Sequence, residues 1–569
     1  MKTRLMSLFL LLTLLCLSLT PAHALSLSGD FKYNLLMNGT VVIEGYIGKA
    51  NTLYIPAYIN GKPVSKIGRN AFWKCYTLQT VHIPDGVTVI DDSAFYSCRN
   101  LLSVKLPDSV TSIGDSAFYD CIQLASVAMP DSITHIGQNA FDGCKALTSF
   151  HIPNSVVEIG KGAFRGCTSL EGFTVFASHP VYAEIDGVLF RKADRALIAY
   201  PAGKPGDSYT VPDGIKIISD DAFNGIPLKS ITLPDSVRSI GQWAFAYSHI
   251  NAVSLPQGLT EIGDHAFYST SLKTITIPGS VKTIGSGAFA NGWQLESVVM
   301  EEGVEAIGDS AFHGNPQLTG VTLPSSVSTV GSGAFSTCPM LKTVTLPDDH
   351  PTLAVIDGAL CSTADRTLLW YPAGRTDAAY TVPNGIVSID SCAFWGCEHL
   401  QYVILPPTVM FIGSSAFQFC TSLTNIVLPE GLLTVEENAF SDCTSLTSVT
   451  LPQTVTTLGA AFARCESLVT VVLPEGITTL EDQIFWGCTS LSSVNIPSSV
   501  TTIGRLAFKG CTSLTELTIP ASVTSIAYDA FEDCPSLTLT VYSGSYAQQH
   551  CEQHKLPHTV PDSLSWLTD

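Results

Sequence analysis

Cysteine is the residue type in this sequence with the widest chemical scope, because thiols form disulfides, bind metals and act as nucleophiles. Thirteen cysteines stand three residues after a phenylalanine, from Cys75 to Cys534. Equivalent residues on stacked turns would lie about 4.8 Å apart, beyond the Cβ separation of about 3.5 to 4.5 Å that a disulfide prefers. In mid-chain the same position holds other residues of modest size: Ser248, Thr270, Gly292 and Asn315. We therefore predict a column of buried free thiols, with disulfides as the alternative in an exported protein.

One local cluster resembles a set of metal ligands: His550, Cys551, Glu552 and His554, with His558 nearby. On a helix His550 and His554 would share a face, as two zinc ligands can. No second group of Cys or His is near enough in sequence to complete a closed site, so we favour a polar capping helix. We predict neither a metal nor any other cofactor, and the two histidines stay the candidates for metal binding.

The sequence shows no arrangement typical of an enzyme. Its serines do not lie in a Gly-x-Ser-x-Gly elbow between a strand and a long helix. Asp186 and Asp357 are candidate catalytic carboxylates, but each precedes a glycine, and Asp-Gly pairs favour turns. We predict a protein without catalytic activity.

The net charge restricts the class of partner. The chain has 29 Lys plus Arg against 49 Asp plus Glu, a formal charge of -20. Nucleic acids and anionic membranes would repel such a protein at long range, so we predict neither as a partner.

One unit recurs along nearly the whole chain, with the pattern Ile-Gly-x-x-Ala-Phe-x-x-Cys-x-x-Leu-x-x-Val-x-Leu-Pro-x-Ser-Val. Its phenylalanines are 22 or 23 residues apart except at two gaps of 59: Phe72, Phe95, Phe118, Phe141, Phe164, Phe223, Phe245, Phe267, Phe289, Phe312, Phe335, Phe394, Phe417, Phe440, Phe462, Phe485, Phe508 and Phe531. A unit of this size cannot bury its own apolar side and must stack on its neighbours. The pattern therefore predicts a solenoid.

The positions of one unit predict its local structure. Leu101, Val104 and Leu106 alternate with small or polar residues, the period-2 pattern of a half-buried strand. Stacked units would join these strands into one long parallel sheet. We expect Ala117 and Phe118 to begin a short turn of helix, and the phenylalanines to stack into an aromatic core.

The unit resembles the BspA-type leucine-rich repeat of bacterial surface and secreted proteins. The resemblance extends over most of the chain and includes the family's N-terminal cap, in Thr40 to Tyr46 and Asn60 to Val64, and its terminal element, in Val541 to Ala547. It implies a leucine-rich-repeat solenoid that is a right-handed superhelix, with a long parallel β-sheet on one face and irregular or short helical turns on the other. It also implies adhesion to host or matrix proteins or to partner cells, without defining a ligand.

The two long gaps contain inserts that align with each other at an offset of 171 residues. Val188 to Phe190 and Ala196 to Tyr200 predict two strands joined by a polar turn, an excursion that would project from one edge. The predicted organisation, including a signal peptide at the N-terminus, is 1–24 signal peptide, 25–66 N-terminal cap, 67–178 first repeat block, 179–215 first insert, 216–349 second block, 350–386 second insert, 387–540 third block and 541–569 C-terminal cap and tail.

The signal peptide is predicted from Lys2 and Arg4, the apolar run from Leu5 to Leu19 and the small residues Ala22 and Ala24. Fifteen apolar residues are few for a membrane span, which needs about 20. We expect cleavage after Ala24, followed by secretion or display at the cell surface, without membrane insertion.

The remaining candidate is the outward face of the predicted sheet. Its binding residues would be mostly hydroxyl-bearing, with one lysine, one histidine and one tyrosine: Ser103, Lys105, Ser126, Ser149, His151, Thr274, Thr276, Thr343, Thr345 and Tyr402. Trp395, Phe411 and Phe419 could join Tyr402 in an aromatic patch. Acidic residues just past the strands, such as Glu302 and Glu475, suit turns and solubility, with calcium binding as the alternative. This surface predicts an adhesin-like binding protein for an extracellular protein or a cell surface. The alternative is a structural spacer of the envelope without a discrete ligand.

Overall fold

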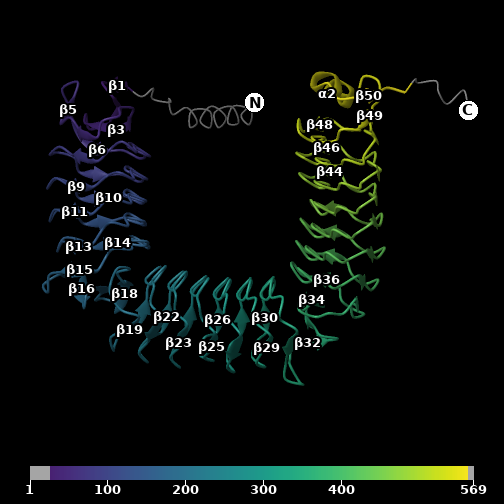
Figure 1. Cartoon of the computed structure of the whole chain (residues 1–569), viewed down its shortest axis with the longest axis horizontal. Coiled ribbons are helices and arrows are strands. Elements are labelled where there is room, and N and C mark those ends of the chain that lie inside the picture. Colours follow the sequence, from purple (N-terminus) through teal and green to yellow (C-terminus); the bar gives the residue numbers. More distant parts are fainter. Residues whose placement is uncertain (1–25, 562–569) are drawn as a thin grey trace, which may run out of the picture. The chain divides into compact units, whose positions relative to one another are not determined.

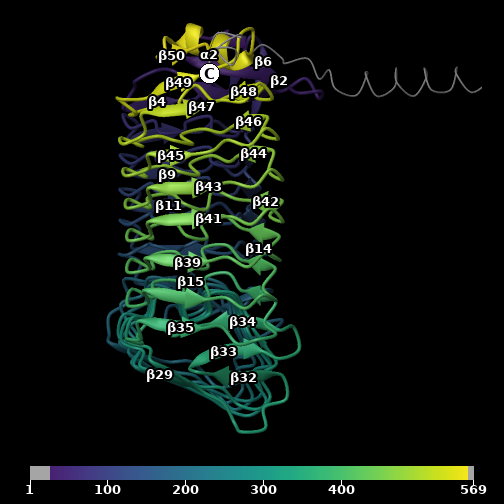
Figure 2. The ribbon, with the colours of Figure 1, turned by 90° about the vertical axis from the view of Figure 1, so that its right-hand side faces the viewer.

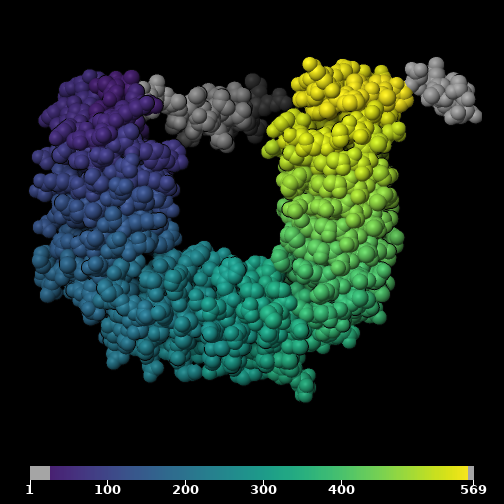
Figure 3. Space-filling view, in the orientation of Figure 1, coloured from purple at the N-terminus to yellow at the C-terminus, as the bar shows by residue number. Residues whose placement is uncertain are grey.

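The computed structural model describes residues 26–561, so the predicted signal peptide and residues 562–569 lie outside the described residues. The chain divides into two compact units, and Figure 1 labels their helix and strands in chain order. Among the described residues, unit 1 comprises 26–205 and 219–223, and unit 2 comprises 206–218 and 224–561. Each is a β-solenoid whose successive turns lie in direct contact (Figure 3).

The strands that carry the candidate surface form what we call the front ladder. In unit 1 these strands run parallel to one another: β4 (Thr52–Tyr54), β7 (Thr80–His82), β9 (Ser103–Lys105) and β11 (Ser126–Ala128), then β13 (Ser149–Ile152) paired with β15 (Gly172–Val175). Val104 points inward at 2% exposure, while Ser103 and Lys105 point outward. The predicted alternation is therefore confirmed.

The opposite side of each turn carries a second parallel ladder, which the sequence analysis missed. In unit 1 this rear ladder comprises β8 (Val89–Ile90), β10 (Ser112–Ile113), β12 (His135–Ile136) and β14 (Glu158–Ile159). The short helical turn expected at Ala117 and Phe118 is wrong, because this corner is an irregular turn. The Phe118 amide donates to the carbonyl of Ala140 on the next turn at 2.8 Å, so it is not available for a helical bond.

Unit 2 repeats this arrangement, as the stacked strands β41, β43 and β45 show in Figure 2. Its front strands are β19 (Ser208–Thr210), β21 (Ser230–Thr232), β23 (Ala252–Ser254), β25 (Thr274–Ile277), β27 (Ser297–Met300), β29 (Gly320–Thr322), β31 (Thr343–Thr345), β35 (Ala379–Thr381), β37 (Tyr402–Ile404), β39 (Asn425–Val427), β41 (Ser448–Thr450), β43 (Thr470–Val472), β45 (Ser493–Val494), β47 (Glu516–Thr518), β49 (Thr538–Thr540) and β50 (His558–Thr559). Its rear strands are β20 (Ile217–Ile218), β22 (Ser239–Ile240), β24 (Glu261–Ile262), β26 (Thr283–Ile284), β28 (Ala306–Ile307), β30 (Thr329–Val330), β36 (Ser388–Ile389), β38 (Phe411–Ile412), β40 (Thr434–Val435), β42 (Thr457–Leu458), β44 (Thr479–Leu480), β46 (Thr502–Ile503) and β48 (Ser525–Ile526).

The front strands do not form the single sheet that we predicted. They are divided into shorter sheets, for example β25-β27-β29-β31 and β35-β37-β39 in unit 2. Strands of three residues offer few backbone bonds each, so a small change in the spacing of two turns is enough to interrupt the ladder.

The two chain ends depart from the repeat. At the N-terminal end β1 (Ser26–Ser28), β2 (Phe31–Leu35) and β3 (Val41–Tyr46) pair antiparallel, and β3 pairs parallel with β6 (Lys62–Ile67), which also pairs with β5 (Tyr58–Ile59). At the C-terminal end lies the helix α2 (Tyr546–His554), whose N-cap hydroxyl of Ser545 accepts a bond from the Gln548 amide.

Each insert has three antiparallel strands where we predicted two. The first contains β16 (Tyr182–Ile185), β17 (Val188–Arg191) and β18 (Ala196–Ala199), and the second contains β32 (Leu353–Ile356), β33 (Ala359–Ser362) and β34 (Thr367–Trp370). The first insert lies only in part at the surface: Ile185 and Asp186 at the turn between β16 and β17 are exposed, while Val188, Leu189 and Phe190 are all buried. Their apolar side chains gain more by joining the core than by facing water.

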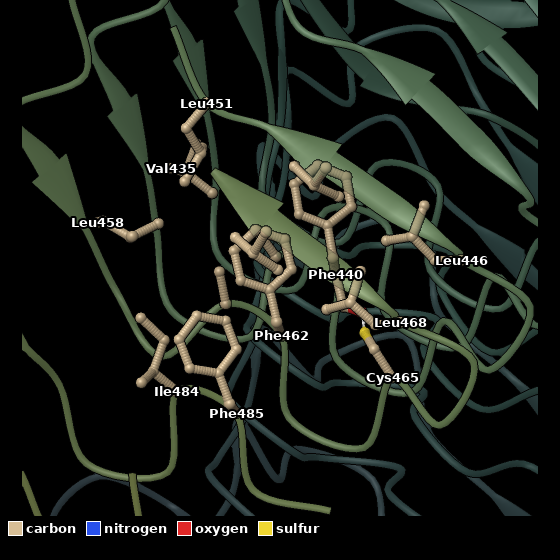
Figure 4. Close-up of a cluster of buried hydrophobic side chains, with 14 of the residues drawn as sticks. Val435, Phe440, Leu446, Leu451, Leu458, Phe462, Cys465, Leu468, Ile484 and Phe485 are labelled. Carbon is tan, nitrogen blue, oxygen red and sulfur yellow. Dashed lines mark hydrogen bonds between the residues drawn. The ribbon is translucent and has the colours of Figure 1, made fainter. Parts of the chain in front are cut away.

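The core is the predicted column of aromatic rings. Phe95 and Phe118 lie 5.3 Å apart between ring centroids and are parallel to within 2°. In unit 2 the rings of Phe440, Phe462 and Phe485 succeed one another beside a column of aliphatic side chains (Figure 4). Within each repeat block a phenylalanine is covered on both sides by its equivalents, and at the block ends other aromatic rings such as Tyr200 and Tyr371 take their place, so every turn depends on its neighbours.

Candidate binding surface

The front ladder places the predicted residues in two outward columns. In unit 1, Ser103 pairs in register with Ser126, and Lys105 lies between His82 and Ala128 in the second column. Ser149 and His151 lie on β13, which belongs to a separate sheet. Ser103, Lys105, Ser126 and Ser149 are exposed, and His151 is half-buried.

In unit 2 the candidate threonines lie on one sheet. Thr274 and Thr276 are on β25, Thr343 and Thr345 are on β31, and all four are exposed. Tyr402 is 51% exposed on β37, in a different sheet. The surface is therefore a set of patches, one for each sheet.

Some of its hydroxyls bond to a side chain on the neighbouring turn. The hydroxyl oxygens of Thr322 and Thr345 are 2.7 Å apart on adjacent strands. His151 Nδ1 lies 3.1 Å from the Thr174 hydroxyl. Bonds of this kind fix the side chains before a partner arrives, which reduces the entropy lost on binding.

The predicted aromatic patch does not form as one cluster. Tyr402 is on the front ladder and Phe411 is on the rear ladder. Trp395 and Phe419 do make contact, edge to face with 5.0 Å between centroids. The prediction was wrong because it assigned residues of different faces to one surface.

The sequence analysis also missed exposed apolar residues on the front ladder. Ile404 is 58% exposed and Val427 is 72% exposed, and the two are register partners next to Tyr402. In unit 1 the Tyr54 ring stacks on His82 with 4.1 Å between centroids. The signal was present in the sequence, because Ile404 and Val427 occupy outward positions that hold Ser or Thr on most other turns.

The thiol column is buried except at its two ends, where Cys75 and Cys534 are half-buried. All sixteen cysteines within residues 26–561 are free, and the thiol of Cys98 donates to the carbonyl of Phe72 at 3.0 Å. The same bond recurs on other turns, for example from Cys420 to Phe394 at 3.1 Å. Burial raises the pKa of the Cys121 and Cys420 thiols to about 12, so both stay protonated.

The histidines of α2 are adjacent but do not form a metal centre. The rings of His550 and His554 are 4.4 Å apart between centroids. Burial, with a smaller contribution from the His554 charge, lowers the pKa of His550. Among residues 26–561 there is no group of three or more His, Cys, Asp or Glu side chains that could hold a metal ion.

The acidic residues past the strands cap the following turn. Glu302 accepts bonds from the Ser325 amide and hydroxyl at 2.8 and 3.0 Å, and these bonds hold its pKa below its usual value. Glu475 accepts from Ser498 in the same way. These carboxylates therefore have a structural use as hydrogen-bond acceptors.

Comparison with known proteins agrees with this architecture. The sequence profile described as "BspA type Leucine rich repeat region (6 copies)" matches residues 65–190, 206–319, 283–355, 378–491 and 459–551. The chain belongs to the BspA-type leucine-rich repeat family. No curated protein matches the chain in sequence.

Several solved structures of leucine-rich repeat proteins are similar. The pneumococcal vaccine antigen PcpA shares 22% identity at a TM-score of 0.52, over 67% of this chain and 98% of its own. A leucine-rich cell surface protein from Faecalibacterium prausnitzii shares 25% identity at a TM-score of 0.39, over 84% and 95%. A leucine-rich repeat protein from Bacteroides ovatus shares 22% at 0.36, over 90% and 99%. The first of these supports the fold alone.

The described part of the chain has no helix long and apolar enough to cross a membrane. Its one described α-helix, α2, has nine residues and is polar.

Proposed function

We propose that this BspA-type repeat protein is a secreted or cell-surface binding protein, adhesin-like, that holds an extracellular protein or a cell surface against its front ladder. The proposal rests on one observation, the exposed outward columns that parallel backbone pairing holds in register. A rigid face of this kind binds with little loss of conformational entropy. The family supports the same class of function.

The strongest contact region is the pair of strands β37 and β39 in unit 2. Tyr402, Ile404 and Val427 are exposed there by 51%, 58% and 72% on two adjacent turns. Exposed apolar residues that cluster in this way mark interaction sites, and tyrosine is enriched among the residues that dominate binding energy. We name these three residues the β37–β39 patch.

The test is binding of the purified chain to immobilised matrix proteins, mucin, whole bacteria and host cells, with heat-unfolded protein as the negative control. The variant Tyr402→Ser, Ile404→Thr, Val427→Thr gives the patch the residues found at equivalent positions of other turns, so its fold should persist. We expect at least a tenfold loss of affinity for the bound target.

The matched control is Val299→Thr, which removes another exposed apolar residue from β27. It should bind like the unaltered chain. Unchanged binding by the triple variant would place the contact outside the β37–β39 patch, and equal loss in both variants would extend the contact to β27. Absence of binding across the whole panel would reject the adhesin-like function.

The second candidate is a structural spacer. The hydroxyl pair of Thr322 and Thr345 favours it, because side chains that satisfy one another need no partner. A spacer would show no saturable binding in the same panel.

A further inference from the structure

The corners that join the rear and front ladders contain a second surface, made of aromatic rings. In unit 2, Trp243 and Tyr247 occupy one corner, and His265 and Tyr268 occupy the next. The rings of Trp243 and His265 stack at 4.1 Å with 5° between their planes. Tyr268 lies 5.3 Å from both Trp243 and Tyr247. Four rings from two turns therefore form one cluster.

These rings stand where the backbone resists large side chains. Trp243, Tyr247 and His265 have φ values of 58°, 57° and 56°, in the left-handed region. Other turns mostly place Gly, Asn, Asp or Ser at the same two corner positions, for example Ser93, Asp120 and Gly143. Bulky residues in this region are outliers that cluster at functional sites.

The ring of Tyr247 has one open face. On one side Tyr268 meets it edge to face. On the other side the preceding turn offers Gly225, whose amide donates to the Ala246 carbonyl at 2.8 Å. A Cβ atom at Gly225 would find nothing within 4 Å, and Tyr247 is 51% exposed. The preceding turn therefore leaves space beside the ring.

The rest of the cluster supports a flat, uncharged platform. Trp243 and Tyr247 are parallel to within 9° with centroids 6.2 Å apart. His265 backs the Trp243 ring, and Gly287 leaves room for it, because a Cβ there would lie 2.8 Å from the imidazole. The Asn291 side-chain amide donates to the Tyr268 hydroxyl at 2.6 Å. Desolvation by burial lowers the pKa of His265, which favours the neutral ring.

We propose that Trp243 and Tyr247 form a stacking platform for a pyranose ring of a neutral glycan. A pyranose has an apolar C–H face that fits an aromatic ring, and a rim of hydroxyls that suits polar groups such as the Tyr268 hydroxyl and the Asn291 side chain beside the rings. The four rings and Asn291 include no cationic side chain that could pair with an anionic sugar, so we expect the sugar to be neutral. This site is on the corners, so it stands independently of the function proposed for the front ladder.

The test uses the purified chain and immobilised neutral oligosaccharides of glucose, galactose and N-acetylglucosamine. An anionic oligosaccharide and a proline decapeptide serve as the other arms of the panel. We expect saturable binding to a neutral oligosaccharide, with Trp243→Asn and Tyr247→Asn each lowering its affinity at least tenfold.

Asparagine is the replacement of choice because it tolerates left-handed backbone, which offsets part of the packing lost with each ring. Thermal unfolding of each variant checks that it stays folded at the temperature of the binding assay. The matched control is Phe419→Asn, which removes an aromatic ring at an equivalent corner with φ 60° elsewhere in unit 2. It should leave sugar binding unchanged.

Failure of every neutral oligosaccharide to bind overturns the proposal. So does binding that survives both platform variants, or binding of the proline peptide alone.

Discussion

The position three residues after the core phenylalanine is filled in two ways within unit 2. From residue 420 to residue 534 it is a cysteine whose thiol donates to the carbonyl of a phenylalanine on the preceding turn, as Cys443 does to Phe417 at 3.1 Å. From residue 248 to residue 315 it is Ser, Thr, Gly or Asn. The backbone of the turn is similar in both stretches, so the comparison shows what this position requires of a side chain.

Asn315 also bonds to the carbonyl of a phenylalanine on the preceding turn, but through a side-chain amide in place of a thiol. Its side-chain amide donates to the carbonyls of Phe289 and Phe312 at 3.0 and 2.6 Å, and its oxygen accepts from the Gly292 amide at 2.9 Å. A Cβ at Gly292 would lie 2.7 Å from that oxygen, so the larger Asn315 uses the space that glycine leaves one turn earlier.

Ser248 makes no such hydrogen bond. Its hydroxyl is buried and has no hydrogen-bond partner. This position therefore favours a small buried side chain that can donate to the phenylalanine carbonyl of the preceding turn. The C–S bond of cysteine is longer than the C–O bond of serine, so the thiol reaches that carbonyl and the hydroxyl does not.

The largest expected effect is on thiol reactivity. With a pKa of about 12, against about 8.5 for a free thiol, Cys420 carries very little thiolate at pH 8. We expect iodoacetamide to label it more than a hundredfold more slowly in the native chain than in urea, measured by peptide mass spectrometry. Comparable rates in both conditions would mean that the column is open to solvent.

The next effect is on the stability of the asparagine-filled turn. Asn315→Ala removes three hydrogen bonds and leaves the buried Gly292 amide without its acceptor, so we expect a loss of about 3 kcal/mol in the free energy of unfolding. Urea unfolding followed by circular dichroism measures it. The control Asn425→Ala, on an exposed strand position, should change stability by less than about 0.5 kcal/mol. If both variants lowered the free energy of unfolding by the same small amount, the hydrogen bonds of Asn315 would not contribute to stability.

The smallest effect comes from exchanging cysteine and serine at this position. Cys443→Ser should cost about 1 to 2 kcal/mol, because it buries a hydroxyl in the manner of Ser248. Ser248→Cys should stabilise the chain by up to about 1 kcal/mol for the converse reason. The same urea titration compares them, and shifts of the same sign would refute the rule drawn from the comparison.

Much of this fold could be predicted because the same residue pattern recurs along nearly the whole chain. The alternation around Val104 predicts the front strands, and the spacing of Cys98 and Cys121 argues against disulfides. The rear ladder could not be found in the same way, because a strand as short as Ser112–Ile113 has no periodicity of its own. Its pairing exists only once neighbouring turns are stacked.

The same distinction, between local pattern and stacking of turns, applies to the candidate binding sites. The amino-acid order alone is enough to give the period of the solenoid, its buried faces and its outward columns, since side-chain alternation is a local property of each strand. The stacking of turns decided which outward residues are neighbours: it separated Phe411 from Tyr402, placed Ile404 beside Val427, and gathered Trp243, Tyr247 and Tyr268 into one cluster. Residues a whole turn apart in sequence meet only through the packing between turns, and no local pattern encodes that distance.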